Sequence, residues 1–370
     1  MRIAMLGHKR MPSREGGVEV VVEELSTRMV ALGHDVTVYS RKGHNVAGAE
    51  YDGAIVSEHK GVTIKEVPTI DARGFAALTS SYFAAKAAIA DKPDVIHFHA
   101  EGPCAMIGFA KREGIRTVAT IHGLDWQRAK WGKIASAYIK HGERVAAKHA
   151  DEIIVLSKNV QEYFKREYNR ETNFIPNGID CKEPVELTES TEGIVSKRKP
   201  YVLFLGRIVP EKGIHYLIDA YSSINLDVNL VIAGGSSDSQ EYFKKIKKLA
   251  GHDKRIVFPG FVQGRILEEL YSNASVFVLP SDLEGMPISL LEAMSYGLCC
   301  LTSNIPECKD VLGNCGEVFE KGNVSDLVSK LQKLLLMPEL RKEYGNAARK
   351  RVLSQYDWDS VVKKTLKLYQ

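Results

Sequence analysis

The sequence predicts an α/β protein built from two doubly wound domains with parallel sheets. Short apolar runs alternate with segments of helical periodicity, which is the pattern of repeated strand–helix–strand units. This series is interrupted by a polar stretch at residues 181–200 and then starts again. A chain of 370 residues is long enough for two domains that each bury a core. We therefore expect two Rossmann-like domains that face each other across a cleft.

The N-terminal domain is predicted over residues 1–180. Helices are expected at 18–33 and 80–90, between short apolar runs that read as buried strands. Those runs lie at residues 2–7, 35–40, 94–99, 116–123, 151–157 and 172–176.

After the linker at 181–200, the C-terminal domain is predicted over residues 201–356. Amphipathic helices at 324–337 and 338–356 close it, and no strand follows them. The tail at 357–370 is therefore expected to pack back on the first domain. The strands of this domain are expected at 201–208, 228–235, 255–262, 275–281 and 298–304.

Composition excludes several classes of protein. A content of 44% hydrophobic and 26% charged residues argues against disorder, and a net charge of +4 is too small to imply nucleic acid. No apolar run reaches the length of about 18 residues that a membrane span needs. The six cysteines form no Cys-x-x-Cys pair, so we infer a reducing, cytoplasmic setting.

The segment SDLEGMPISLLEAMSYG, residues 281–297, follows a predicted strand and leads into a predicted helix. Pro287 suits the first helical position, where a missing N–H costs nothing. The backbone N–H groups of Gly285 and Met286 would then lie at a helix N-terminus, which favours an anion. Ligands of open parallel sheets bind beyond the carboxyl ends of the strands, so this turn is a candidate anion site.

Two carboxylates in this segment are candidate ligand-binding groups. Glu292 lies with Ser289 and Ser295 on a polar stripe of an otherwise apolar helix, and its carboxylate suits a ribose diol. Glu284, at the mouth of the turn, suits a hydroxyl beyond the phosphate. The alternative is a solvent-facing stripe, with Glu284 stabilising the helix dipole.

Arg207 and Lys212 follow another predicted strand, within the stretch LGRIVPEKG. Two cations near a helix start concentrate positive potential where a diphosphate can bind. The stretch is not a P-loop, because Gly-Lys-Ser/Thr is missing. The alternative is a pair of ordinary surface cations.

Gly16 and Gly17 begin the helix after the first strand and follow a loop that holds four basic residues, His8, Lys9, Arg10 and Arg14. Two glycines allow a backbone to approach a ligand closely. The Gly-x-Gly-x-x-Gly fingerprint is absent, which weakens a nicotinamide dinucleotide interpretation. The alternative is a flexible turn.

His122 and Asp125 directly follow a predicted strand in the stretch ATIHGLD. A histidine in this place suits a hydrogen bond to a sugar hydroxyl or to a departing phosphate. The alternative is a structural histidine at a strand end.

Together these stretches resemble the retaining family 4 glycosyltransferases of the GT-B fold. EGMPISLLE resembles the paired-glutamate motif of that family, and GRIVPEKG resembles its Arg/Lys phosphate clamp. GGVE resembles its N-terminal glycine loop, HGLD its histidine position, IPNGID its strand before the linker, and YDWDSVV its terminal helix. Each motif is weak alone, but six in the expected order over the whole chain are specific.

The resemblance implies a role for each matched residue. Arg207 and Lys212 would neutralise the diphosphate of a nucleotide sugar, and Glu292 would bind the ribose. Glu284 and His122 would contact the donor sugar. Other donor contacts would come from Gly16 and Gly17, from the backbone around Phe261 and Val262, and from Gly285, Met286, Pro287 and Ile288.

The resemblance also implies a retaining reaction without a metal or a further cofactor. The acceptor would attack the sugar on the face that the diphosphate leaves. Arg207 and Lys212 would supply the positive charge that a metal supplies elsewhere. We interpret the Asp-x-Asp pair of Asp357 and Asp359 as helix capping.

A basic helix predicts an acceptor-side surface. Lys133, Lys140, Arg144 and Lys148 share one helical face, and Lys130, Trp126 and Trp131 precede it. Such a face suits an anionic membrane, as for a lipid-linked acceptor at the inner side of the plasma membrane, with Asp125 near the acceptor. The alternative is an ordinary solvated face.

We therefore expect a hexosyl- or rhamnosyltransferase type of enzyme that acts in bacterial cell-surface polysaccharide synthesis. Its substrates would be a nucleotide sugar and a saccharide or lipid-linked acceptor, with no nucleic acid. Two alternatives stay open: a UDP-sugar epimerase of GT-B shape, and a non-catalytic sugar-nucleotide-binding module.

Overall fold

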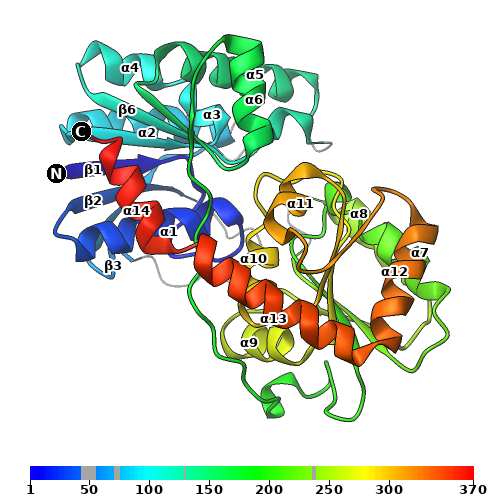
Figure 1. The fold of residues 1–370 in the computed structure, drawn as a ribbon. Helices are drawn as coiled ribbons and strands as arrows, with labels where there is room; N and C mark the ends of the chain where they lie inside the picture. The colour runs from blue at the N-terminus through cyan, green and yellow to red at the C-terminus, as the bar shows by residue number, and fades with distance from the viewer. Residues whose placement is uncertain (43–55, 71–75, 129–130, 236–238) are drawn as a thin grey trace. The chain divides into compact units, whose positions relative to one another are not determined.

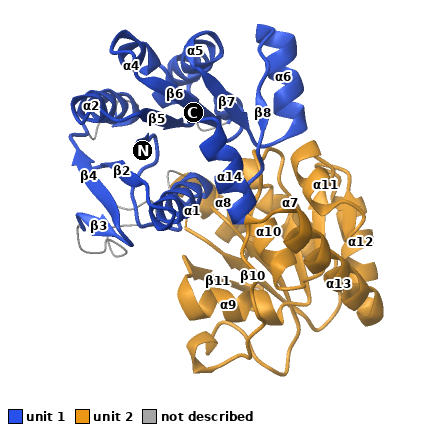
Figure 2. Ribbon diagram, turned by 60° about the vertical axis from the view of Figure 1, so that its left-hand side comes forward, with its two compact units in different colours: residues 1–178, 358–370 blue, residues 179–357 orange. Residues whose placement is uncertain are grey.

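The computed structural model describes residues 1–42, 56–70, 76–128, 131–235 and 239–370. The chain forms two compact units, Met1–Gly178 with Trp358–Gln370, and Ile179–Asp357 (Figure 2). Each unit combines helices with a largely parallel sheet, which confirms the predicted fold class (Figure 1). The polar residues 181–200 belong to the second unit.

The sheet of the first unit has the order β3-β4-β2-β1-β5-β6-β7-β8 among the described residues. Only the pairing of β3 with β4 is antiparallel there. Every residue of β5 is buried, so both faces of the sheet are covered, as parallel strands require. The strands are β1 (Arg2–Leu6), β2 (Asp35–Arg41), β3 (Glu58–His59), β4 (Val62–Val67), β5 (Val95–His99), β6 (Arg116–Ile121), β7 (Glu152–Val155) and β8 (Asn173–Phe174).

Helices connect most of these strands, and the C-terminal helix α14 belongs to the same unit. α14 packs against α1, where Nη1 of Arg28 lies 3.2 Å from a carboxylate oxygen of Asp359. Asp359 lies in the first turn of α14 and is largely exposed, so the buried side chains of Trp358, Val361 and Val362 hold the tail on the first unit more than this ion pair does. The helical segments are α1 (Gly17–Ala31), α2 (Ala76–Ala90), α3 (Glu101–Cys104), α4 (Ile107–Arg112), η2 (Asp125–Gln127), α5 (Lys133–His149), α6 (Lys158–Tyr168) and α14 (Trp358–Lys367).

The second unit has a fully parallel sheet of order β11-β10-β9-β12-β13-β14 in the part of the chain that the structure describes. Its strands are β9 (Tyr201–Leu205), β10 (Asn229–Ala233), β11 (Ile256–Gly260), β12 (Val276–Leu279), β13 (Cys300–Ser303) and β14 (Glu317–Phe319). Its helical segments are η3 (Glu189–Thr191), η4 (Pro210–Lys212), α7 (Ile214–Ser222), α8 (Gln240–Ala250), α9 (Gly264–Asn273), α10 (Ile288–Ser295), α11 (Pro306–Leu312), α12 (Val324–Leu336) and α13 (Pro338–Gln355).

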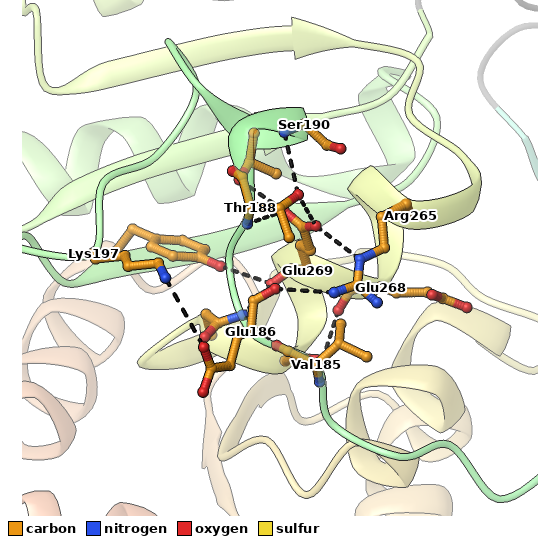
Figure 3. Close-up of polar contacts among 12 residues, drawn as sticks. Val185, Glu186, Thr188, Ser190, Lys197, Arg265, Glu268 and Glu269 are labelled. Carbon is orange, nitrogen blue, oxygen red and sulfur yellow. Dashed lines mark hydrogen bonds and ion pairs between the residues drawn. The ribbon is translucent and has the colours of Figure 1, made fainter.

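A buried carboxylate fixes the polar stretch at residues 181–200 to this unit (Figure 3). Glu269 of α9 accepts hydrogen bonds from the N–H and hydroxyl of Thr188 at 3.0 and 2.5 Å, and from Nε of Arg265 at 2.8 Å. The Thr191 hydroxyl donates to it at 2.9 Å. Burial opposes ionisation of Glu269, but the hydrogen bonds from Thr188, Arg265 and Thr191 outweigh it and lower its pKa to about 2.

In both sheets the first strand of the unit lies where the strand order reverses. β1 lies between β2 and β5, and β9 lies between β10 and β12. Ligands of doubly wound sheets bind at such switch points, beyond the carboxyl ends of the strands. The turns after β1, β5, β9 and β12 are therefore the places to search for a site.

Three strands escaped the sequence prediction. In β4 only Val62, Ile64 and Val67 are buried, and the polar residues between them interrupt any continuous apolar run. β3 and β14 have only two and three residues, too few to show a period.

Candidate functional site

The two turns beside the switch point of the second unit hold an ion pair. Nζ of Lys212 lies 2.6 Å from Oε1 of Glu284, and the Ser281 hydroxyl donates to the same oxygen at 2.6 Å. The side chains of Lys212 and Glu284 are 13% and 8% exposed. Oε2 of Glu284 has no hydrogen-bond partner among the described residues. One carboxylate oxygen and part of the ammonium therefore remain for a ligand.

A glycine makes this pairing sterically feasible. η4 ends at Lys212 and is followed by Gly213, whose φ is 63°. A Cβ there would lie 2.0 Å from the carbonyl oxygen of Pro280, which follows β12. The N–H of Asp282 also donates to the backbone oxygen of Glu211 at 2.8 Å. The turns after β9 and β12 are thus joined by backbone contacts, and at Gly213 this close approach leaves no room for a Cβ.

Arg207 lies half-buried in the same β9 turn as Lys212. The turn is packed closely against the end of β10, because a Cβ at Gly234 would lie 1.8 Å from the oxygen of Gly206. The N–H of Ile208 donates to the oxygen of Gly235 at 2.9 Å. Both predicted cations therefore come from one turn, which is packed against the end of β10.

The carboxylate of Glu292, on α10, accepts a hydrogen bond from a tyrosine of α9 that the sequence did not indicate. The hydroxyl of Tyr271 donates to Oε2 of Glu292 at 3.0 Å, and the Tyr271 ring stacks on Tyr296 with centroids 5.5 Å apart. Burial and the Glu292 charge raise the pKa of Tyr271 well above its usual value, so it stays a donor. The predicted polar stripe is incomplete, because Ser295 is buried and donates to the backbone oxygen of Glu292.

The turn before α10 is mostly buried. Gly285, Met286 and Pro287 have little exposed surface, so a ligand would meet chiefly their backbone. The helix begins at Ile288, one residue later than predicted, because Pro287 has extended angles of −77° and 101° and acts as its N-cap. Val262 lies half-buried in the separate turn between β11 and α9.

In the first unit, His122 directly follows β6 and is 7% exposed. Its Nε2 lies 3.0 Å from Nδ1 of His99, the last residue of β5. Burial lowers the pKa of His122 to about 4, although the charges of Asp125 and Glu19 act in the opposite direction. His122 is therefore a neutral imidazole at neutral pH.

Asp125 contacts a glutamate, Glu101, that the sequence prediction missed. Its N–H donates to Oε1 of Glu101 at 2.8 Å, and its carboxylate lies 2.7 Å from Nε of Arg128. Glu101 is fully buried, and burial together with the Asp125 charge raises its pKa well above the usual range. The signal in the sequence was an acid, Glu101, one residue beyond the strand run VIHFH. Ala100 between them has φ 71°, a conformation rare for alanine and common near functional sites.

Gly16 and Gly17 form the start of α1 at the β1 turn. Gly16 is the N-cap, and a Cβ on it would lie 2.3 Å from Oε2 of Glu19. Oε1 of that carboxylate accepts the N–H of Lys9 at 3.0 Å. The glycine therefore leaves room for the carboxylate that orders the preceding loop.

Two family models match successive parts of the chain. The model described as Glycosyltransferase Family 4 matches residues 15–183, and the model described as Glycosyl transferases group 1 matches residues 188–351. The chain belongs to glycosyltransferase family 4. The Arg207, Lys212, Glu284 and Glu292 group lies within the second matched region.

Relatives of known sequence match this glycosyltransferase over its whole length. An uncharacterised glycosyltransferase of Methanocaldococcus jannaschii is 28% identical over 100% of this chain and 98% of its own. The alpha-maltose-1-phosphate synthase of Mycolicibacterium smegmatis is 26% identical over 100% and 99%.

Solved structures share the GT-B fold. Sucrose-phosphate synthase from Thermosynechococcus elongatus has a TM-score of 0.84 at 22% identity, covering 100% of this chain and 98% of that one. Anabaena HepE in complex with UDP-glucose has a TM-score of 0.82 at 16% identity, covering 99% of each. These likenesses establish the two-domain GT-B architecture of the family 4 glycosyltransferase.

One residue of the predicted basic face is placed differently in this glycosyltransferase. Nζ of Lys140 lies 2.8 Å from Oε1 of Glu143, whose side chain has no exposed area. The same ammonium lies 4.7, 4.8 and 5.3 Å from the ring centroids of Trp126, Tyr163 and Tyr168. The prediction that Lys140 faces outward with its neighbours is wrong, because a buried carboxylate and three rings bind its charge inside the unit.

The rest of that face is exposed. Lys133, Arg144 and Lys148 are on the surface of α5, and Ile134 at its start is 89% exposed. Lys130 lies outside the described residues. Within the described ranges, no helix has the length and apolar character to cross a membrane. No cluster of three or more described His, Cys, Asp or Glu side chains is arranged to hold a metal ion.

Proposed function

We propose that this chain is a retaining glycosyltransferase that moves a hexose or deoxyhexose from a nucleotide diphosphate sugar. The acceptor is a saccharide or a lipid-linked saccharide in cell-surface polysaccharide synthesis. One observation carries the proposal: the Lys212–Glu284 pair lies in two adjoining turns at a switch point, with Arg207 in one turn and the start of α10 after the other. Cations and helix N–H groups suit a diphosphate, and the carboxylate suits the sugar attached to it.

The structure supports a division of roles within these turns. Arg207 and Lys212 bind the phosphates, and Oε2 of Glu284 accepts a hydroxyl of the sugar. Glu292, held by Tyr271, binds the ribose diol. The backbone of Gly285, Met286, Pro287 and Ile288 meets phosphate and sugar, and the backbone at Val262 faces the base.

The reaction follows from where charge develops. The bond between the anomeric carbon and the diphosphate oxygen breaks, and its electron pair stays on the diphosphate. The acceptor oxygen attacks the anomeric carbon from the same face, and its proton passes to the departing phosphate. Arg207, Lys212 and the N–H groups before α10 then stabilise the transition state more than the bound donor.

Residues of the first unit serve the sugar and the acceptor in this proposal. Neutral His122 contacts the donor sugar, Gly16 and Gly17 admit the phosphates, and Asp125 contacts the acceptor. Exposed Lys133, Arg144 and Lys148 beside Ile134 support contact with an anionic lipid surface, at the inner face of the plasma membrane.

A thermal-shift panel of UDP-, GDP-, dTDP- and ADP-sugars tests the donor class, because a ligand that binds the folded state raises the melting temperature. NMR of the sugar released from the donor that binds then separates three outcomes. A product with the donor's anomeric configuration supports the proposal. An epimerised sugar indicates an epimerase, and binding without turnover indicates a binding module.

A further inference from the structure

Three buried histidines form a connected row at the carboxyl edge of the first sheet. His97 and His99 of β5 stack with ring centroids 4.2 Å apart, and Nδ1 of His99 lies 3.0 Å from Nε2 of His122. His97 is fixed at both nitrogens, by the Tyr369 hydroxyl at 2.6 Å and the Thr120 hydroxyl at 2.7 Å. Tyr369 of the C-terminal tail therefore fixes the ring of His97, on which the ring of His99 stacks.

All three rings are neutral at neutral pH. Burial lowers the pKa of His97 to about 3 and that of His122 to about 4, and it holds the pKa of His99 well below the usual value. A neutral imidazole has one N–H and one bare nitrogen. The contact between His99 and His122 therefore has a direction, which depends on the ring that supplies the hydrogen.

Two arrangements fit the distance of 3.0 Å. In the first, Nδ1–H of His99 donates to the bare Nε2 of His122, which leaves a hydrogen on Nδ1 of His122. In the second, Nε2–H of His122 donates to the bare Nδ1 of His99, which forces the hydrogen of His99 onto its Nε2. The two arrangements thus make His122 a donor or an acceptor toward a ligand.

The surroundings of His99 favour the first arrangement. Nε2 of His99 is buried and has no hydrogen-bond partner among the described residues. In the second arrangement this atom would carry an N–H with no acceptor, and buried N–H groups without a partner are rarer than buried acceptors without one. In the first arrangement it is only a bare nitrogen.

We infer that His99 is a positioning residue: its Nδ1–H donates to His122 and fixes His122 as the Nδ1–H tautomer, a hydrogen-bond donor toward the bound ligand. Nδ1 of His122 makes no hydrogen bond to any described residue, so its hydrogen remains for that ligand. The oxygen of a sugar hydroxyl or of a phosphate accepts it. Only this last assignment rests on the proposed function, since the tautomer is a property of the free protein.

The tautomer can be measured directly in the full-length protein without substrate. Long-range ¹H–¹⁵N correlation spectra of histidine-labelled protein at neutral pH report which ring nitrogen carries the hydrogen. The His122 signals are assigned by their loss in His122→Gln. We expect Nδ1–H for His122 and Nδ1–H for His99. A His122 ring protonated on Nε2 would overturn the inference, whatever the variants show.

Two variants test the positioning role. His99→Asn keeps an N–H close to the place of Nδ1, so we expect the His122 tautomer to persist. His99→Phe keeps a ring for stacking but no donor, so we expect His122 to sample both tautomers. A pure Nδ1–H tautomer in a folded His99→Phe protein would refute the role. The wild-type spectrum still decides the tautomer if that variant does not fold.

Turnover of UDP-glucose, used as a probe, adds a second readout. We expect His99→Phe to lower kcat about tenfold and His99→Asn to change it far less, because one hydrogen bond is worth about a tenfold change. Equal loss in both variants would indicate a merely structural residue. Absence of turnover in the wild type would count against the proposed function and would leave the tautomer result intact.

Discussion

Lys212 and Glu284, 72 residues apart in the chain, form an ion pair of 2.6 Å in which both side chains are largely buried. Each therefore neutralises the other before any ligand arrives. Removing one partner of a buried pair leaves an uncompensated charge, so effects on stability and on binding must be measured separately.

Replacing Arg207 or Lys212 with Ala is expected to abolish the rise in melting temperature that a nucleotide diphosphate gives the wild type. A ligand at about 100 times its Kd stabilises by about 2.7 kcal/mol, which a thermal-shift assay detects. The melting temperature of each variant with ligand is compared with that of the same variant without ligand. This is needed because Lys212→Ala also leaves the largely buried carboxylate of Glu284 without its counter-charge. Lys254→Ala, at an exposed position of the same unit, is the control. Unaltered shifts in both variants would refute the phosphate clamp.

Glu284→Gln separates the sugar from the diphosphate. The amide has nearly the same shape but no charge, so Lys212 becomes fully available to the phosphates. We expect the shift produced by the bare nucleoside diphosphate to persist or grow. The difference in shift between nucleotide sugars that differ only in the sugar should shrink. Loss of diphosphate binding in this variant would argue against a sugar-binding role for Glu284.

Gly213→Ala should destabilise the second unit strongly, because its Cβ would lie 2.0 Å from the oxygen of Pro280. We expect a loss of about 3 kcal/mol from overpacking and left-handed strain together. Gly193, in the same unit, is the control, with φ 80° and nothing within 4 Å of an added Cβ. Gly193→Ala should cost only about 1 kcal/mol. Urea denaturation gives both values, and equal losses would show that the contact with Pro280 relaxes freely.

The lowered pKa of Glu269 predicts that the stability of the protein depends on pH. Its pKa is about 2 in the folded protein, below the value of about 4.3 for an unfolded glutamate. The stabilisation is therefore fully present above the unfolded pKa and is lost as the pH falls toward about 2. Near neutral pH, Glu269→Gln should lower the melting temperature by about 2–4 °C for each kcal/mol of unfolding free energy that is lost. The difference in melting temperature between this variant and the wild type should narrow below about pH 4.

Glu268→Gln on the same helix controls for the substitution itself, since its side chain accepts none of the hydrogen bonds from Thr188, Thr191 and Arg265 (Figure 3). A gap between wild type and Glu269→Gln that stays constant from neutral pH to about pH 3 would contradict the lowered pKa.

The exposed part of the basic helix predicts binding to anionic membranes. Liposomes that contain anionic lipid should retain the protein at low salt, and Arg144→Glu with Lys148→Glu should release it with an unchanged melting temperature. Lys140→Glu should instead destabilise the first unit, because it places a second carboxylate beside buried Glu143. Equal retention by neutral and anionic liposomes would exclude a role for the basic face.

The class of fold was predictable because it depends on local patterns. Fully buried strands such as β5 and β12 appear as short apolar runs, and the helices between them show their own period. The positions of Arg207, Lys212 and Glu284 in turns after such strands were predictable, and we expected a site there because parallel sheets bind ligands at that edge.

The sequence alone thus determined the two series of strands and helices and the turns in which we expect a site. Only the tertiary structure decided which polar groups meet. It paired Lys212 with Glu284. It brought Glu101 into hydrogen-bond contact with Asp125, and His99 with His122. It also enclosed Lys140 among aromatic rings from η2 and α6. The physical reason is range: a periodic pattern records which face of an element is buried, whereas the partners of Glu284, Asp125 and His122 come from elements far along the chain.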